Sequence, residues 1–157
     1  ILDLGSGPGR DSWIFKKRGF DPLCLDISKE MLKLCQDKGL KTKQMDINRL
    51  KFPSNYFAGV WSYTSLTTMS KKEAWRAIEK IHRILKKDGI FFLGLIEGKG
   101  EGWKAPDEKY DLPRFRSRYQ AIEVLRNISN FELLYFRKIE KKETGRNSYL
   151  NFMFRKA

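Results

Sequence analysis

Residues 2–11, LDLGSGPGRD, join a short apolar run to a loop of three glycines. The apolar run is typical of a buried strand, and the next stretch, 10–18, has the pattern of a helix with Trp13, Ile14 and Lys17 on one side and Gly19 at its end. Glycines between a strand and a helix allow a sharp turn and let a ligand approach the backbone closely. The free N–H groups at the start of the helix favour a phosphate or a carboxylate there.

Apolar runs and amphipathic stretches alternate along the rest of the chain. Strands are predicted at ILDL, DPLCLD, KTKQMD, FAGVWSY and DGIFFLGLIE, and Ser28 and Ser70 are good N-caps for helices, the second running through Lys87. This alternation indicates parallel βαβ units and a sheet covered on both faces. A loop at 98–116 and a helix at about 117–128 precede FELLYFRKI and NSYLNFMFR, which alternate like antiparallel strands.

The expected fold is therefore a three-layer, Rossmann-like α/β sandwich. Its seven-stranded sheet is mostly parallel and carries an antiparallel C-terminal strand pair. The length of 157 residues and the hydrophobic content of 41% fit a single domain spanning residues 1–157.

Composition also limits the class of protein. Cys24 and Cys35 form no CxxC pair and no Cys/His cluster, so a metal site or a disulfide framework is not expected, and a reducing cytoplasm fits. No apolar run reaches membrane-spanning length. The net charge of +13 is spread over both halves of the chain, which is typical of a lysine-rich solvated surface and leaves a polyanion site open as the alternative.

The spacing of the glycines separates two ligand classes. A dinucleotide fingerprint reads GxGxxG, whereas Gly5, Gly7 and Gly9 give GxGxG and Arg10 stands where that fingerprint has its third glycine. A bulky side chain there would obstruct the close helix–strand packing around a pyrophosphate. The loop therefore disfavours NAD.

Two acids follow the next two predicted strands. Asp26 lies 19 residues after Gly7 and ends the second strand, where its carboxylate can accept from both hydroxyls of a ribose. Asp46 ends the third strand, where it can accept from the exocyclic amine of an adenine. Ile27 and Ile47 follow these acids and could sandwich the base. Each acid alone also suits a turn, but the ordered set indicates a nucleoside site.

As a set, ILDLGSGPGRD, LCLDISKEML, MDINRLKFPSNYF and IHRILKKDGIFFL resemble the successive motifs of class I S-adenosylmethionine-dependent methyltransferases. IEGKGEGW and RNSYLNFMF resemble a branch of small stand-alone members, the methyltransferase type 11/25-like branch. The resemblance implies S-adenosyl-L-methionine as the cofactor. Because such proteins carry helices before the first strand, we expect a chain that starts at Ile1 to lack this segment, to bind the cofactor weakly and to be less stable.

The resemblance also implies roles along the cofactor, from its methionine to its adenine. The methionine part would be held by Asp3, Gly5, Ser6 and Gly7, with Arg10 and Asp11 near its carboxylate or amine. Asp26 would bind the ribose, and Ile27, Asp46 and Ile47 would bind the adenine. Ser62 and Tyr63 would line the region around the sulfonium.

No residue stands out as a general base. Many relatives carry a His after the fourth strand, where this chain has Thr68, and the sole histidine, His82, lies in the long helix and is interpreted as structural. Tyr63 and Glu97 are weak catalytic candidates. The expected acceptor is a small molecule. The alternatives are an RNA methyltransferase or RNA-binding relative, because the chain is strongly basic, and a non-catalytic nucleotide-binding module.

The loop at 98–116 and its continuation combine aromatic and basic side chains. Such a mixture can stack on and neutralise an RNA strand or an anionic small molecule, and the alternative is a lid whose aromatics pack on the sheet. The residues are Trp103, Tyr110, Phe115 and Tyr119, interleaved with Lys99, Lys104, Lys109, Arg114, Arg116 and Arg118.

Overall fold

A computed structural model of the chain describes residues 1–106, 111–145 and 147–157. The elements up to the fifth strand are β1 (Leu2–Leu4), α1 (Arg10–Lys17), β2 (Leu23–Asp26), α2 (Lys29–Asp37), β3 (Lys41–Gln44), η1 (Ile47–Arg49), β4 (Phe57–Tyr63), η2 (Ser65–Thr68), α3 (Lys71–Ile84) and β5 (Leu85–Ile96). They are followed by β6 (Glu101–Lys104), β7 (Arg114–Ser117), α4 (Ala121–Asn127), β8 (Phe131–Ile139), α5 (Lys141–Thr144) and β9 (Tyr149–Lys156).

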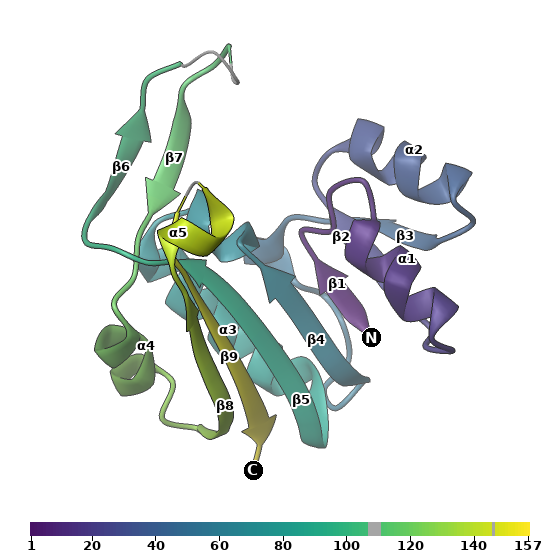
Figure 1. Cartoon of the computed structure of the whole chain (residues 1–157). Coiled ribbons are helices and arrows are strands. Elements are labelled where there is room, and N and C mark those ends of the chain that lie inside the picture. Colours follow the sequence, from purple (N-terminus) through teal and green to yellow (C-terminus); the bar gives the residue numbers. More distant parts are fainter. Residues whose placement is uncertain (107–110, 146) are drawn as a thin grey trace.

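The seven predicted strands form one sheet in the order β3-β2-β1-β4-β5-β9-β8. The first five strands pair in parallel, whereas β9 runs antiparallel to both β5 and β8. The strand order reverses between β1 and β4, which places the glycine loop after β1 at the topological switch point where such sheets bind ligands. The expected Rossmann-like fold with its antiparallel strand pair is therefore confirmed (Figure 1).

Alternation along the strands assigns each helix to a face of the sheet. Leu2 and Leu4 of β1 join the core with α3, while Asp3 between them bonds to Ser12 of α1 on the opposite face. In β2, Cys24 packs with Leu32 and Cys35 of α2. Helices α1 and α2 thus cover one face near β1 and β2, and α3 covers the other.

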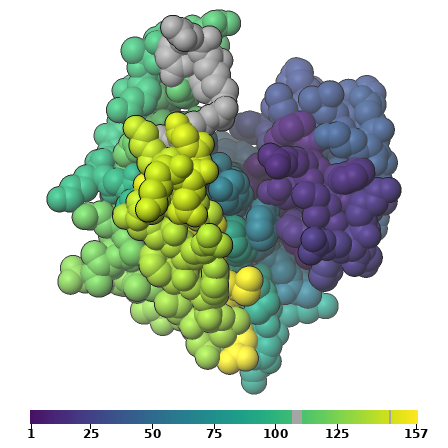
Figure 2. Space-filling model, viewed as in Figure 1, coloured from purple at the N-terminus to yellow at the C-terminus, as the bar shows by residue number. Residues whose placement is uncertain are grey.

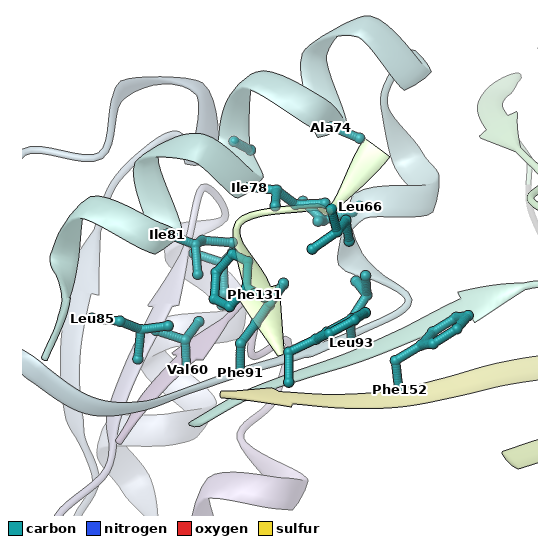
Figure 3. Close-up of a cluster of buried hydrophobic side chains, with 14 of the residues drawn as sticks. Val60, Leu66, Ala74, Ile78, Ile81, Leu85, Phe91, Leu93, Phe131 and Phe152 are labelled. Carbon is teal, nitrogen blue, oxygen red and sulfur yellow. The ribbon is translucent and has the colours of Figure 1, made fainter. Parts of the chain in front are cut away.

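The main core lies between α3 and the sheet (Figure 3). Ser70 caps α3 with a reciprocal Ser70–Glu73 capping box, and Ala74, Ile78 and Ile81 are buried at helical spacing. Burying each isoleucine contributes about 2–3 kcal/mol, so this face fixes the helix on the sheet. The helix ends at Ile84 rather than at the predicted Lys87, because Leu85 is extended and the chain enters β5 directly.

The side of α1 that carries Trp13 and Ile14 is not its buried side. Trp13 and Ile14 are 44% and 38% exposed, whereas Ser12 is fully buried. The Ser12 hydroxyl donates to the carboxylate of Asp3 at 2.7 Å, and Phe15 packs edge-on against Trp61 at 5.1 Å between ring centroids. A buried carboxylate needs a hydrogen-bond donor, and this need sets the orientation of the short helix.

The segment 98–116 was expected to be a loop, but it contains most of a β-hairpin. Strands β6 and β7 pair in antiparallel fashion, with Trp103 opposite Phe115. The following helix, α4, starts at Ala121 rather than near 117, because Tyr119 is held extended by a bridge to Glu97. Lys109 and Tyr110, which were part of the predicted aromatic and basic mixture, lie outside the described residues.

None of the helices that the structure describes has the length and apolar content needed to cross a bilayer.

Candidate functional site

The glycine loop follows β1 and is hydrogen-bonded to the end of β2. The backbone N–H groups of Gly5 and Ser6 both donate to the carbonyl of Leu25, at 2.8 and 3.0 Å. Gly5 has a φ of 72°, and a Cβ on it would lie 2.4 Å from the Cβ of Ser65. Only glycine allows the loop to turn here while touching the segment that follows β4.

Asp26 is fixed at the end of β2 by two backbone donors. Its Oδ2 accepts from the N–H of Gly7 at 2.8 Å, and its Oδ1 accepts from the N–H of Ser28 at 3.0 Å. Each carboxylate oxygen has a second acceptor site. The carboxylate is therefore oriented in advance and still able to accept from the hydroxyls of a ligand.

Asp46 has a comparable place one strand further out. It caps η1, with Oδ1 accepting from the N–H of Asn48 at 2.8 Å. Ile47 follows it, and Ile27 follows Asp26 with 68% of its surface exposed. An exposed isoleucine beside an oriented carboxylate offers an apolar surface to a flat ligand.

These residues line one cavity of about 690 Å³. The surface in Figure 2 is hollowed between the N-terminal helices at right and the green hairpin side at left. The lining residues are Gly5, Asp26, Ile27, Met45, Asp46, Ile47, Asn48, Ser65, Thr68, Met69, Ser70, Glu73, Trp103 and Phe115. Five residues predicted from the sequence are thus brought together: Gly5, Asp26, Ile27, Asp46 and Ile47.

Asp3 lies beneath the loop rather than in the cavity wall. It is 3% exposed and accepts from the Ser12 hydroxyl. Burial raises the pKa of Asp3 from 3.8 to about 6, opposed mainly by that hydrogen bond. The carboxyl group is a buried acid poised near neutral pH under the turn that carries Gly5 and Gly7.

Four other predicted residues lie outside the cavity lining. Ser6 contacts the Cys35 thiol at 3.9 Å, and Gly7 is held by Asp26. Arg10 is exposed in the first turn of α1. Ser62 is fully buried with its hydroxyl 2.8 Å from that of Ser65, so it contacts the cavity only through Ser65.

The two weak catalytic candidates, Tyr63 and Glu97, also lie outside this lining. The Tyr63 ring stacks near Phe92 and Tyr149, at 6.4 and 6.0 Å between centroids, and burial raises its pKa. A phenol that ionises less readily is a poorer base at neutral pH. Glu97 forms an ion pair with Lys138 at 2.9 Å and borders a different hollow, beside Lys141.

Two further predicted residues have structural contacts. Asp11 accepts from the indole N–H of Trp61 at 2.9 Å, which ties α1 to β4. His82 packs edge-on against Phe131 at 4.9 Å, and burial lowers its pKa. These contacts agree with a structural interpretation of His82.

The sequence did not identify Ser65, Met69 and Ser70, which close the cavity opposite Asp26 and Asp46. They follow β4, so the rule that ligands lie at the carboxyl ends of strands could have found them. Trp103 and Phe115 were named from the sequence as part of the aromatic and basic mixture, but a segment interpreted as a loop did not assign them to this cavity. Among the described residues, no cluster of three or more His, Cys, Asp or Glu side chains could hold a metal ion.

Comparison with known families gives one match over more than half of the chain. The family profile described as a methyltransferase domain matches residues 2–93. This range runs from β1 to the middle of β5 and includes the glycine loop and both strand-end acids.

Individual relatives have a low sequence identity to this chain. A malonyl-[acyl-carrier protein] O-methyltransferase of Enterobacter lignolyticus is 28% identical over 125 residues, which cover 75% of this chain and 49% of that protein. The chain spans about half the length of the three enzymes of this name that it matches.

Solved structures share the fold. A SAM-dependent methyltransferase from Methanosarcina mazei superimposes with a TM-score of 0.88 at 20% identity, covering 99% of this chain and 91% of that one. The 1,6-didemethyltoxoflavin-N1-methyltransferase of Burkholderia thailandensis, solved with its substrate and S-adenosylhomocysteine, gives 0.80 at 21% identity, covering 99% and 70%. At these identities the likeness establishes the fold alone.

Proposed function

This chain belongs to the methyltransferase-domain family, and on that premise we propose that it transfers a methyl group from S-adenosyl-L-methionine to a small-molecule acceptor. One observation carries the proposal: Gly5, Asp26 and Asp46, at three successive strand ends, line a single cavity. A glycine turn and two acids in that order suit a nucleoside joined to an amino acid better than they suit a pyrophosphate.

The cavity suits the nucleoside part of the cofactor. Asp26 would accept from the ribose hydroxyls through the acceptor sites that Gly7 and Ser28 leave open. Asp46 would accept from the adenine amine, and Ile27 and Ile47 would cover the faces of the base. About 690 Å³ leaves room for an acceptor beside the cofactor.

The methionine part would lie over the glycine loop. Gly5, Ser6 and Gly7 would hold it, with Asp3 beneath and Arg10 in the first turn of α1. Ser62 would act by orienting Ser65, since their hydroxyls are 2.8 Å apart. Tyr63 would stay at the edge of the sulfonium region.

Bound S-adenosylmethionine supplies an activated methyl group, and the chain supplies alignment. Besides Asp26 and Asp46, the cavity is lined by the carboxylate of Glu73, which accepts from Ser70 in the capping box, and these hydrogen bonds lower its pKa. Such a carboxylate is a weak base. The site therefore suits acceptors that offer a free electron pair at neutral pH, such as a carboxylate or an unprotonated nitrogen.

The names of similar proteins support a small-molecule acceptor. The relative from Enterobacter lignolyticus is named for a malonyl group on a carrier protein, and the Burkholderia thailandensis enzyme for a small heteroaromatic compound. The two acceptors differ, so only the broad class is proposed for this chain.

Calorimetric titration with S-adenosylhomocysteine and with NAD tests the proposal. We expect the sulfur nucleoside to bind and NAD not to bind. Asp26→Ala should weaken S-adenosylhomocysteine binding by about tenfold or more, because a charged acceptor is lost. The control Asp37→Ala removes an exposed carboxylate paired with Lys33 and should leave binding unchanged. Equal affinity for NAD, or equal effects of the two substitutions, would contradict the proposal.

A further inference from the structure

The β6–β7 hairpin has two chemically different faces. In an antiparallel pair, opposite residues share a face and successive residues alternate. Trp103 lies opposite Phe115, and Lys104 lies opposite Arg114. One face is therefore aromatic, and the other carries cationic side chains.

The aromatic face belongs to the cofactor cavity. Trp103 and Phe115 line the same hollow as Gly5 and Asp26, with their rings edge-to-face at 5.7 Å and 84°. Trp103 is nevertheless 73% exposed. An indole left largely in water is available for contact with a ligand in the cavity.

The cationic face borders a second hollow of about 380 Å³. Its described lining residues are Lys104, Arg114, Arg116, Arg118, Ile96, Ala105 and Asn147, and they include no carboxylate. Neither Lys104 nor Arg118 forms an ion pair with any described acid. Lys104 and Arg118 therefore place positive charge in a concave site, which attracts an anionic group.

Trp103 connects the two sites. It lines the cofactor cavity and also a smaller hollow of about 260 Å³, which it shares with Lys104 and Arg118. The acid in that smaller hollow, Glu101, is already engaged, because its Oε2 accepts from the backbone N–H of Lys71 at 2.6 Å. A ring stacked on Trp103 would therefore have cations within reach of its substituents.

The hairpin is also attached to the segment that forms the cavity wall. The Ser117 hydroxyl donates to the carbonyl of Met69 at 2.9 Å, and the N–H of Lys71 donates to Glu101. Since Met69 lines the cavity itself, the hairpin is held in a defined position beside the cofactor. Side chains on such a fixed element can select a ligand by shape and charge.

We propose that the β6–β7 hairpin recognises the methyl acceptor, and that this acceptor is a small molecule with a flat ring and an anionic group. The ring stacks on Trp103 where the indole lines both the cofactor cavity and the smaller hollow, and the carboxylate or phosphate binds Lys104 and Arg118 in that hollow. This inference rests on the proposed function, because the acceptor must lie next to a cofactor in the same cavity.

Calorimetry in the presence of saturating S-adenosylhomocysteine tests the inference with matched probes. Naphthoate and naphthyl phosphate are compared with their neutral counterparts, naphthamide and naphthol. We expect each anion to bind about tenfold more tightly than its neutral counterpart, as for other charge-assisted contacts. Trp103→Ala should weaken both anions by about tenfold, because stacking is lost, while Trp103→Phe should restore part of the affinity. Arg118→Gln should remove most of the preference for anions.

Two control variants separate this effect from general damage. Trp13→Ala removes an exposed indole from α1, and Arg18→Gln removes an exposed cation at the end of that helix; neither should change probe binding. Equal affinity for charged and neutral probes, absence of probe binding, or no effect of Trp103→Ala would overturn the inference. Tighter binding of a uridine RNA decamer, with a steep salt dependence, would overturn it in favour of a nucleic-acid acceptor.

If S-adenosylhomocysteine itself does not bind, the result contradicts the proposed function and the acceptor assignment that depends on it. If it binds and the naphthyl probes do not, only the acceptor assignment fails.

Discussion

The cavity has two walls that are built in different ways. The wall at the ends of β1, β2 and β3 consists of backbone turns and carboxylates held by backbone N–H groups, as at Gly7 and Asp26. The wall formed by β6 and β7 consists of exposed side chains on a hairpin that forms a separate two-stranded sheet. The first wall is part of the folded core, and the second is added to it (Figure 1).

This difference suggests that the first wall determines stability and cofactor binding, whereas the second wall determines selectivity for the acceptor. Changes in the first wall should reduce folding and cofactor binding together, because both depend on the same turns. Changes in the second wall should alter acceptor binding and leave the sheet intact. The predictions below test that separation, beginning with the largest expected effect.

Gly5→Ala should damage the first wall most. A Cβ at this position would lie 2.4 Å from the Cβ of Ser65, and the backbone has a φ of 72°. Steric overlap and left-handed strain together should lower the free energy of unfolding by about 2–5 kcal/mol and weaken S-adenosylhomocysteine binding by about a hundredfold. Denaturant unfolding and calorimetry measure the two effects.

Gly19→Ala is the matched control for Gly5→Ala. Gly19 also has a positive φ, 84°, but nothing lies within 4 Å of its added Cβ. It should lower stability by about 1 kcal/mol and leave cofactor binding unchanged. If both substitutions impair binding equally, contact with Ser65 is not what makes Gly5 necessary.

Asp3→Asn should separate stability from binding, because Asp3 lies beneath the turns of the first wall and is not one of its residues. Because burial raises the pKa of Asp3 in the folded protein to about 6, above its ordinary value of 3.8, the neutral carboxyl group contributes its full stability below pH 4, and this contribution is lost as the pH rises through 6. Since a pKa difference of one corresponds to 1.36 kcal/mol, the free energy of unfolding falls by up to roughly 3 kcal/mol by neutral pH. Asn should recover this stability at pH 7.5 and flatten the pH dependence between 4 and 6.

Chemical unfolding across pH 4 to 8, with S-adenosylhomocysteine titrations beside it, measures the effect of Asp3→Asn. Binding should fall even as stability rises, because the charge beneath the methionine part of the ligand is lost. An exposed control, Asp37→Asn, should change neither quantity. An Asp3→Asn protein that is less stable at pH 7.5 would show that the ionised carboxylate supports the fold.

Ser117→Ala should have the smallest effect on folding and act through the second wall. It removes the hydrogen bond to the Met69 carbonyl and should lower the free energy of unfolding by about 1 kcal/mol. S-adenosylhomocysteine affinity should stay the same, while naphthyl phosphate affinity should fall severalfold because the hairpin is less well fixed. Ser54→Ala, at an exposed serine, is the control, and equal loss of both affinities would contradict the separation of the two walls.

The same contrast explains what could be predicted from the sequence. The strands, the long helix and the order Gly5, Asp26, Asp46 depend on local patterns, and the sheet topology then brings those positions together. The packed side of α1 could not be predicted, because a bond between Ser12 and a buried Asp3 outweighed the exposure of Trp13. The hairpin could not be predicted because alternating aromatic and basic residues also occur in loops.

The residues proposed for the sulfonium region, Ser62 and Tyr63, were the hardest to place. Ser62 and Tyr63 follow the pattern of a strand end, yet one is buried against Ser65 and the other stacks near Tyr149. Which side of β4 reaches a ligand depends on its register with β1 and β5, and a single strand does not encode that register.

The central claim is that Asp26 holds the ribose of the cofactor, and a binding cycle tests it directly. Calorimetry would compare S-adenosylhomocysteine with its 2′,3′-dideoxy analogue on the wild-type chain and on Asp26→Asn. Each change alone should weaken binding by about tenfold, and the two together should weaken it little further, because both remove the same contact. Fully additive losses, or no loss on either change, would contradict the assignment of the ribose to Asp26.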